Sequence, residues 1–285
     1  MRSATVNGLT YDVHDPHDLR ADQCAVPTVL LSSGLGGAAG YWQAQWPALL
    51  AAGYRVIVYD HRGTGRSKGA LPQPYSIADM MQDVIDILDH SGTASCHMAG
   101  HALGGLVALQ LALSAPQRID SLLLINAWAR VAAHTQRCFA ARLALLDACG
   151  ARAYVEAQPL FLYPAAWSEA HLAQISAEVE HACAHFPGAD VLHARVAALK
   201  AFDVEQRLGE ISVPVWLAAS RDDVLVPWTA SQRLADRLPN ASLELSPAGG
   251  HAHNVTCADA FNRSMLAFLA ALDSSRQATA GVRSC

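Results

Sequence analysis

Short, uninterrupted apolar runs recur along the chain and are separated by longer stretches with helical spacing. Such runs are typical of strands buried on both faces of a parallel sheet. They occur at residues 26–31, 54–59, 96–99, 121–125, 213–219 and 242–245. The clearest helical stretch lies between the second and third runs and follows Ser76, which is placed to cap it. This alternation predicts an α/β fold with a mostly parallel sheet and helices on both faces.

Two segments depart from the alternation. Residues 5–11 surround Asn7-Gly8, which predicts a two-residue hairpin at an antiparallel edge of the sheet. Residues 127–207 have helical spacing and no strand pattern, so we expect an all-helical lid between two core strands. A long loop without secondary structure is the alternative, and the helical spacing argues against it. The predicted parts are a core at 1–126 and 208–273, the lid at 127–207 and a flexible tail at 274–285.

Composition narrows the kind of protein. Hydrophobic residues make up 52% of the chain and charged residues 16%, which allows a large core. The net charge of −5, without a basic stripe, argues against a nucleic-acid partner. No apolar stretch is long enough to span a membrane, and the first residues lack the apolar run of a signal peptide. Seven cysteines without a Cys-x-x-Cys spacing favour free thiols in a reducing cytoplasm. The oligomeric state is left open, with a homodimer as one option.

The stretch Gly100-His101-Ala102-Leu103-Gly104 carries the strongest chemical signal. It joins a predicted strand to a predicted helix through a tight turn, as Gly-x-Ser-x-Gly does where it presents a catalytic serine. Here Ala102 stands in the serine position, and a methyl group cannot act as a nucleophile. His101 either faces the site or packs beneath the turn. The sequence therefore predicts a scaffold for covalent catalysis without its nucleophile.

Four more motifs lie on loops that follow predicted strands. They are Ser-Ser-Gly-Leu-Gly-Gly at 32–37, Asp-x-Arg-Gly-x-Gly-x-Ser at 60–67, Asp222-Asp223 ahead of Pro227, and Gly-Gly-His-Ala-His at 249–253. Three of them also have a purely structural interpretation. The first can be a simple glycine turn, the aspartates can cap a helix, and a single histidine is more often structural than catalytic.

Together and in this order, the motifs resemble those of the α/β-hydrolase superfamily, and the resemblance covers residues 26–272. It implies the α/β-hydrolase fold, with a mostly parallel sheet of the eight-stranded type, helices on both faces and an all-helical lid. It implies that Ala102 occupies the nucleophile position of a triad, with His251 as its histidine and Asp223 as its acid. Asp223 is favoured over Asp222 by its distance from Pro227. A histidine with a carboxylate partner can transfer protons, because the carboxylate holds its tautomer and orientation.

The same resemblance assigns the remaining positions. The backbone N–H groups of Leu35 and Leu103 would form the oxyanion hole. The loop at 60–67 would have a structural role, with charged hydrogen bonds that hold it beside the turn. Ser33 replaces the histidine that is usual in the superfamily and is a candidate substrate contact, as is His253.

A narrower resemblance lies in the predicted lid and in the last motif. The resemblance is to a bacterial α/β-hydrolase family of the pyrimidine-utilisation pathway, and it lies at residues 134–139, 155–164 and 249–256 and at the turn 100–104. That family also carries Ala in the serine position of this turn. This resemblance implies a role in uracil degradation. The implied substrate is carbamate, converted to ammonia and carbon dioxide. The alternative is 3-aminoacrylate, converted to malonic semialdehyde and ammonia. Both reactions also proceed without an enzyme.

Without a serine hydroxyl, the attacking group is expected to be water, with His251 as general base or proton shuttle. A triad site that lacks its nucleophile retains about 10³–10⁴-fold rate enhancement, which is useful only for a labile substrate. Two other hypotheses stay open. One is a non-catalytic pseudoenzyme that binds a small acid or a pathway partner, and the other is lyase or oxygenase chemistry without a cofactor.

A small anionic substrate also needs a cation. Arg130, Arg137 and Arg142 lie near the start of the lid, and Arg137 is favoured because it falls within the family-like stretch 134–139. His181 and His185 stand one helical turn apart, but no acidic third ligand is close to them in sequence. We therefore predict no metal and no cofactor.

Overall fold

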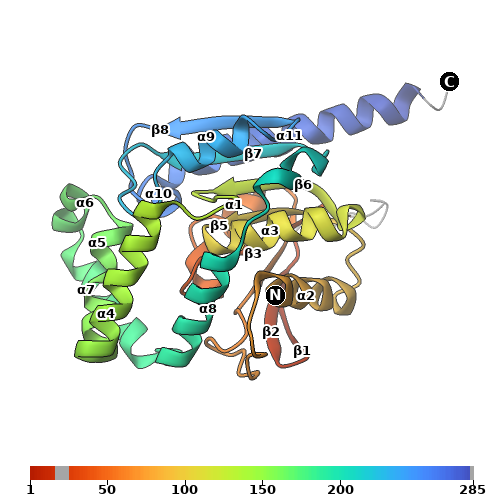
Figure 1. Cartoon of the computed structure of the whole chain (residues 1–285). Helices are drawn as coiled ribbons and strands as arrows, with labels where there is room; N and C mark the ends of the chain where they lie inside the picture. The colour runs from red at the N-terminus through yellow and green to blue at the C-terminus, as the bar shows by residue number, and fades with distance from the viewer. Residues whose placement is uncertain (17–25, 283–285) are drawn as a thin grey trace.

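The computed structural model describes residues 1–16 and 26–282 of the 285-residue chain, and one sheet of eight strands runs through this part (Figure 1). The strand order is β1-β2-β4-β3-β5-β6-β7-β8. The strands are β1 (Arg2–Val6), β2 (Leu9–His14), β3 (Thr28–Ser32), β4 (Arg55–Tyr59), β5 (Cys96–His101), β6 (Ile119–Ile125), β7 (Val215–Ser220) and β8 (Ala241–Ser246). The predicted α/β-hydrolase fold is confirmed.

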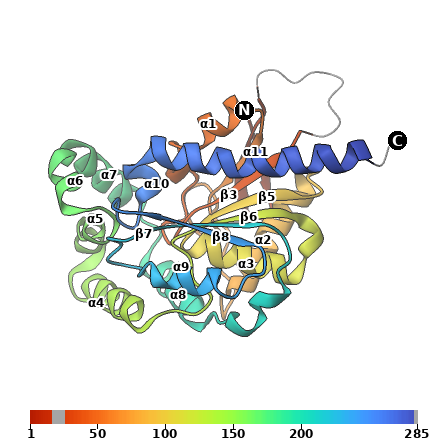
Figure 2. The same cartoon turned by 90° about the horizontal axis from the view of Figure 1, so that it is seen from above.

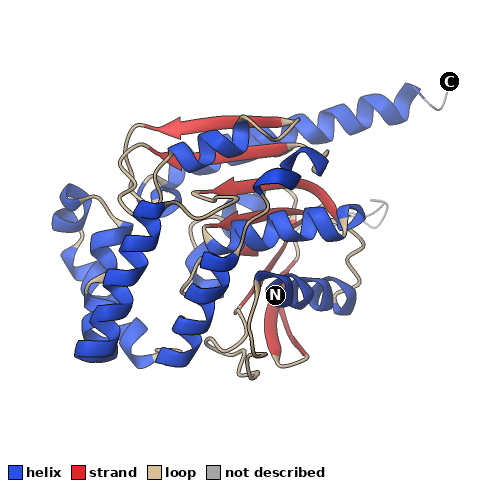
Figure 3. Cartoon of the chain, in the orientation of Figure 1, coloured by secondary structure: helices blue, strands red, loops and turns tan. Residues whose placement is uncertain are grey.

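Helices cover the sheet on both faces, as Figure 3 shows by colour. The α-helices are α1 (Trp46–Ala51), α2 (Ile77–His90), α3 (Leu103–Ser114), α4 (Ala133–Glu156), α5 (Gln158–Leu162), α6 (Ala165–Ala170), α7 (Leu172–Ala184), α8 (Ala189–Ala201), α9 (Thr229–Ala235), α10 (His253–Thr256) and α11 (Ala258–Val282). Short 3-10 helices lie at η1 (Ala39–Trp42), η2 (Pro116–Arg118) and η3 (Glu205–Glu210). Seen from above, α1 and α11 lie on one side of the sheet, with α2, α3, α8 and α9 on the other (Figure 2).

The predicted hairpin and its antiparallel edge are present. Asn7 and Gly8 have φ angles of 49° and 80° and connect β1 to β2. β1 pairs antiparallel with β2, and β2 pairs antiparallel with β4, whereas the five remaining neighbouring pairs in the sheet are parallel.

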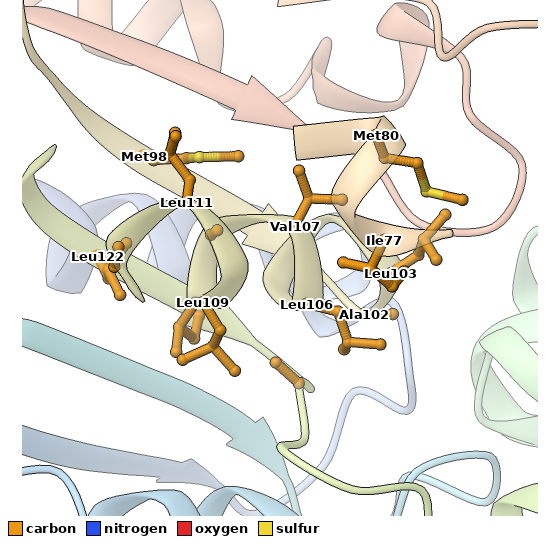
Figure 4. Packing of buried hydrophobic residues seen from close by; sticks show 14 of the residues in the cluster. Ile77, Met80, Met98, Ala102, Leu103, Leu106, Val107, Leu109, Leu111 and Leu122 are labelled. Carbon is orange, nitrogen blue, oxygen red and sulfur yellow. The ribbon is translucent and has the colours of Figure 1, made fainter. Parts of the chain in front are cut away.

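The core lies on both sides of the sheet because side chains of a strand alternate between its faces. In β3, Leu30 belongs to the cluster beneath α2 and α3, whereas Val29 and Leu31 belong to the cluster beneath α1 and α11. Figure 4 shows the first cluster, in which α2 and α3 pack against β5 and β6, with Ala102 at its edge. The turn at Ala102 is thus attached to a rigid part of the molecule.

Ser76 begins α2 as predicted. Its side chain accepts a hydrogen bond from the Asp79 backbone N–H (3.2 Å), and the Asp79 side chain accepts one from the Ser76 N–H (2.9 Å). This reciprocal capping satisfies two backbone donors at the start of the helix.

Helices α4 to α8 fill the segment between β6 and β7, which we call the lid segment (residues 127–207). They stand at the carboxyl edge of the parallel strands, where the arrowheads end in Figure 1. The segment contains no strand, only an isolated bridge between Arg130 and Asp203. Helix α4 is interrupted at Gly150, whose φ of 85° and ψ of −179° are not helical.

Helix α11 differs from its prediction at one end. It continues to Val282, whereas a flexible tail is predicted at 274–285. Most of the segment predicted as a tail is therefore helical, and residues 283–285 lie outside the described residues.

Five cysteines are free thiols in the part of the chain that the structure describes: Cys96, Cys138, Cys149, Cys183 and Cys257. Cys24 and Cys285 lie outside it. None of the described helices is long and apolar enough to cross a membrane. The predicted cytoplasmic location stays a prediction.

Candidate active site

The turn between β5 and α3 holds Ala102 in a conformation that L-residues rarely adopt, with φ of 47° and ψ of −109°. A backbone of this kind costs about 1–3 kcal/mol and is kept only where its surroundings enforce it. Here the Ala102 N–H donates to the Ile125 carbonyl (2.8 Å). A Cβ on Gly100 would overlap the backbone of Gly104, and one on Gly104 would overlap the Ser32 carbonyl. The turn therefore has the geometry of a nucleophile elbow, with a methyl group at its centre.

The predicted oxyanion donors lie on two adjoining segments. Leu103 is the first residue of α3, so its N–H has no acceptor within the helix. Gly104 contacts Ser32 at the end of β3, which brings the start of α3 against the loop that contains Leu35. That loop turns through a hydrogen bond from the Gly37 N–H to the Gly34 carbonyl (3.0 Å). The start of α3 and the loop that contains Leu35 therefore adjoin, and the role of their N–H groups as oxyanion donors stays a prediction.

Ser33 is buried within the same loop. Its carbonyl lies 3.1 Å from His61 Nε2, and its hydroxyl has no hydrogen-bond partner among the described residues. Because a buried hydroxyl without a partner is costly, Ser33 stays a candidate for a ligand contact.

His251 and Asp223 form a buried pair. The distance between His251 Nδ1 and Asp223 Oδ2 is 2.7 Å, and both side chains are almost fully buried. Asp223 Oδ1 accepts from the N–H groups of Leu225 (2.8 Å) and Val226 (2.9 Å), which fixes the carboxylate. This arrangement leaves Nε2 of His251 for proton exchange.

The neighbouring Asp222 has a different structural role. It accepts hydrogen bonds from the N–H of Gly250 (2.8 Å), from the N–H of Gly249 (3.2 Å) and from the Ser220 hydroxyl (2.5 Å). It therefore fastens the loop that carries His251, while Asp223 contacts the imidazole itself. Between the two aspartates that the sequence leaves as candidates, only Asp223 can orient the histidine.

His101 packs beneath the elbow. Its Nε2 donates to the His251 carbonyl (2.9 Å), and its ring lies against the rings of Tyr41 and His251. Asn126 Nδ2 donates to the same carbonyl (2.5 Å). Burial, reinforced by the nearby His251, lowers the pKa of His101 well below its ordinary value, so His101 is neutral and structural. Two side chains thus hold the backbone of His251.

His253 is buried between its loop and α11. Its ring packs edge-on against Phe261 of α11, and its Nδ1 lies 3.3 Å from Asn126 Nδ2. Burial lowers its pKa to about 4. These contacts make His253 part of the packing between its loop and α11, and its role as a substrate contact stays a prediction.

The favoured lid cation needs correction. Arg137 lies on the exposed face of α4, and Arg130 forms a largely exposed ion pair with Glu205 (3.4 Å). Arg142, in contrast, is 5% exposed and lies on the face of α4 that contains Phe139 and Leu146. A position three residues after one buried side chain and four before another shares their face of the helix. Helical spacing therefore favours Arg142, whereas the linear motif favours Arg137.

Sequence reasoning missed Arg195 on α8, which is fully buried. Its guanidinium donates to the carbonyl of Leu35 (3.0 Å), to the carbonyl of Arg62 (2.9 Å) and to the Thr64 hydroxyl (2.6 Å). It thereby joins the lid segment to the loop of the expected oxyanion hole. Its place between the apolar Leu192 and Leu199 is the signal that could have revealed it.

The Gly-rich loop at 60–67 has the structural role predicted for it. Asp60 accepts from the Ala39 N–H (2.8 Å) with one oxygen and from the N–H (3.1 Å) and Nε (2.9 Å) of Arg66 with the other. Burial, together with the Arg195 charge, lowers the pKa of His61 to about 3, so this histidine is neutral. The loop supports the site and contributes no reacting group.

The lid segment also binds both loops that carry the pair. His134 Nε2 donates to the Val224 carbonyl (2.8 Å), and the Thr135 hydroxyl donates to the Leu225 carbonyl (2.9 Å). At the other end, the Ala252 N–H donates to the Leu162 carbonyl (3.0 Å). Two lid stretches that carry the narrower resemblance, 134–139 and 155–164, thus contact the loops that carry the His251–Asp223 pair.

His181 and His185 do not form a ligand pair. Their rings stack at 4.2 Å, and His185 Nδ1 donates to the His181 carbonyl (2.9 Å). Among residues 1–16 and 26–282, no group of three or more His, Cys, Asp or Glu side chains could hold a metal ion.

An eight-stranded sheet in this order, with a strained turn between β5 and α3, is the architecture of an α/β-hydrolase, and the chain is a hydrolase of this class. The family model described as "Serine aminopeptidase, S33" matches residues 23–257. The crystal structure of an enol-lactonase from Burkholderia xenovorans LB400 is similar in fold, with a TM-score of 0.82 at 24% identity over 94% of this chain and 100% of that one.

Relatives give a narrower result. A protein of Variovorax paradoxus (strain S110), named "Putative carbamate hydrolase RutD", is 60% identical over 262 residues, which are 92% of this chain and 96% of that protein. A protein of the same name from Caulobacter sp. (strain K31) is 47% identical over 270 residues, 94% of this chain and 98% of that one. The chain therefore belongs to the RutD family of α/β-hydrolases.

Proposed function

We propose that this chain hydrolyses carbamate in pyrimidine degradation, with water attacking where other α/β-hydrolases use a serine. One observation carries the proposal: the elbow holds Ala102, yet the His251–Asp223 pair is intact at 2.7 Å. The names of the relatives support the same substrate. A pair that can move protons, without a nucleophile to activate, is suited to activating water.

The charge of the lid segment supports an anionic substrate. Arg142 and Arg195 are both more than nine-tenths buried, and within the described residues neither forms an ion pair with a carboxylate. Burial lowers the pKa of both side chains, but arginine keeps its charge in proteins. Two buried positive charges favour a negatively charged ligand beneath the lid.

The reaction uses groups of this chain alone. His251 Nε2 takes a proton from water, because Asp223 holds Nδ1, and the water oxygen bonds to the carbamate carbon. The N–H groups of Leu35 and Leu103 stabilise the negative oxygens that form. The imidazolium then returns its proton to nitrogen as the C–N bond breaks. Carbamate and water thereby become ammonia and bicarbonate, the hydrated form of carbon dioxide.

The missing serine limits the substrates. A triad site without its nucleophile retains about 10³–10⁴-fold rate enhancement from binding and the oxyanion hole. Such a factor matters for a substrate that already decays in water, as carbamate does, and leaves a stable ester or amide untouched on a useful timescale.

The test is the decay of carbamate with the wild type, with His251→Ala and with no protein, at equal protein concentrations. We expect the wild type to accelerate decay above the spontaneous rate and His251→Ala to remove most of the increment. Equal rates for the two proteins would exclude the catalytic role of His251. Carbamate binding with no acceleration would support the pseudoenzyme instead, and the same assay with 3-aminoacrylate tests the alternative substrate.

A further inference from the structure

Arg142 has surroundings that packing alone does not require. The guanidinium carbon lies 5.8 Å from the Phe139 ring centre, 5.0 Å from that of Tyr154 and 5.5 Å from that of Phe161. Three aromatic rings from α4 and α5 therefore surround one cation, which stabilises its charge by cation–π attraction. Such rings exclude water but satisfy few N–H groups.

The hydrogen-bonding capacity of Arg142 is largely unused by the described residues. Nη2 donates to the Tyr154 hydroxyl (2.8 Å), and Nε is buried without a partner. A buried N–H that loses water without gaining an acceptor destabilises the folded protein, and more so when it belongs to a charged group. Arg142 is thus a charged donor whose Nε–H has no acceptor among the described residues.

Its neighbours place Arg142 between the loops of the candidate site. One helical turn earlier, Cys138 contacts the Val224 carbonyl, directly after Asp223 (Sγ to O, 3.7 Å). The carbonyl of Leu162, beside Phe161, accepts from the Ala252 N–H next to His251.

On the opposite side, Tyr154 belongs to the apolar cluster against which Leu35 packs. Asp223 directly precedes Val224, and its oxygens already form hydrogen bonds with His251 and two backbone N–H groups.

We propose that the guanidinium of Arg142 binds the carboxylate group of the substrate, so that the site selects small planar monocarboxylates. The planar donor fork of arginine matches the two oxygens of a carboxylate, which a lysine ammonium does not. The aromatic rings limit the ligand to a small group and strengthen the charge interaction by excluding water. This inference rests on the proposed function for its setting, since carbamate is such an anion.

The test measures binding rather than turnover. Acetate has the shape and charge of carbamate, with a methyl in place of the amino group, and does not decompose. Acetamide is its uncharged counterpart. Each is titrated into the wild-type protein and the variants and followed by NMR of the labelled ligand. Arg142→Met removes the charge, Arg142→Lys keeps the charge without the fork, and Arg137→Met is the control on the exposed face of the same helix.

We expect the wild type to bind acetate and not acetamide. Arg142→Met should weaken acetate binding at least tenfold, Arg142→Lys should have intermediate affinity, and Arg137→Met should match the wild type. If Arg142→Met does not fold, Arg142→Lys decides. Acetate binding that is unchanged in both Arg142 variants, equal binding of acetamide, or no binding by the wild type would overturn the proposal.

His251→Ala separates this inference from the proposed function. It should bind acetate like the wild type even though it loses carbamate turnover. If no protein accelerates carbamate decay but acetate binding still depends on Arg142, the proposed function is wrong and the anion site is supported. If carbamate turnover depends on His251 while acetate binding is unchanged in the Arg142 variants, the proposed function is supported and the anion site is wrong.

Discussion

Asp223→Asn changes which ring nitrogen of His251 carries the proton, with little change in the shape of the side chain at position 223. Asp223 Oδ1 accepts two backbone N–H groups, those of Leu225 and Val226, at 2.8 and 2.9 Å. An amide NH₂ cannot accept these bonds, so the asparagine oxygen must take the Oδ1 place and the NH₂ group must face His251 Nδ1. The neutral imidazole then accepts at Nδ1 and carries its proton on Nε2, which can no longer take a proton from water.

The expected loss is large for activity and small for stability. In serine-type triads the same exchange lowers turnover by about 10⁴-fold through the wrong tautomer, so carbamate decay should fall to the spontaneous rate here. Replacing the 2.7 Å charge-assisted bond by a neutral one should cost about 1 kcal/mol of the free energy of unfolding.

Background-subtracted carbamate decay and the ¹⁵N shifts of His251 measure the two consequences together. Asp222→Asn is the matched control, because it leaves the His251 partner in place and should keep activity within about tenfold. If Asp223→Asn retained a tenth or more of the wild-type increment, or if its His251 still carried the proton on Nδ1, this reasoning would be refuted.

Three further predictions concern the elbow and the buried histidines. Gly104→Ala should lower the free energy of unfolding by about 3 kcal/mol or more, because its Cβ would overlap the Ser32 carbonyl; Gly36→Ala, with nothing within 4 Å, should stay within about 0.5 kcal/mol in the same chemical denaturation. Ala102→Ser should create weak activity toward an activated ester, and its absence in a folded variant would show that the elbow and the histidine are misaligned. The contribution of His253 to the free energy of unfolding should be complete above pH 6.5 and should fall as the pH drops towards 4. Over this range the unfolded His253 binds a proton, whereas the folded side chain, with its pKa of about 4, stays neutral. His253→Gln should reduce this slope by about 1.4 kcal/mol per pH unit, and an unchanged slope would contradict the assigned cause.

Local patterns predict the fold well where burial is symmetric. The apolar runs identify β3 to β7 because side chains on both faces of these strands are buried. β8 lies at the edge of the sheet and has no buried position, and its run is short. The ends of strands are harder to predict from local patterns. The apolar run at 96–99 stops before a glycine, yet β5 continues through Gly100 and His101, which pair with Leu124 and Ile125 of β6. Pairing with a distant strand decides such boundaries, and no local pattern contains it.

The candidate site divides in the same way. Motif order brings out Ala102, Asp223 and His251, because loops at the carboxyl edge of a parallel sheet converge. Arg195 could not be predicted from a motif, since its acceptors at Leu35 and Thr64 are 160 and 131 residues away. Arg137 was favoured over Arg142 because a linear match ignores the face of the helix.

The direct test of water attack follows the oxygen of the solvent. If His251 activates water against the carbamate carbon, the first product is bicarbonate with one solvent oxygen; if the C–N bond breaks without attack, the product is carbon dioxide with both original oxygens. Carbamate is mixed with enzyme in H₂¹⁸O, and the carbon product is analysed by mass spectrometry before carbon dioxide and water exchange oxygen. The account predicts one ¹⁸O atom in the product formed above the spontaneous rate, and unlabelled carbon dioxide in that increment would contradict it.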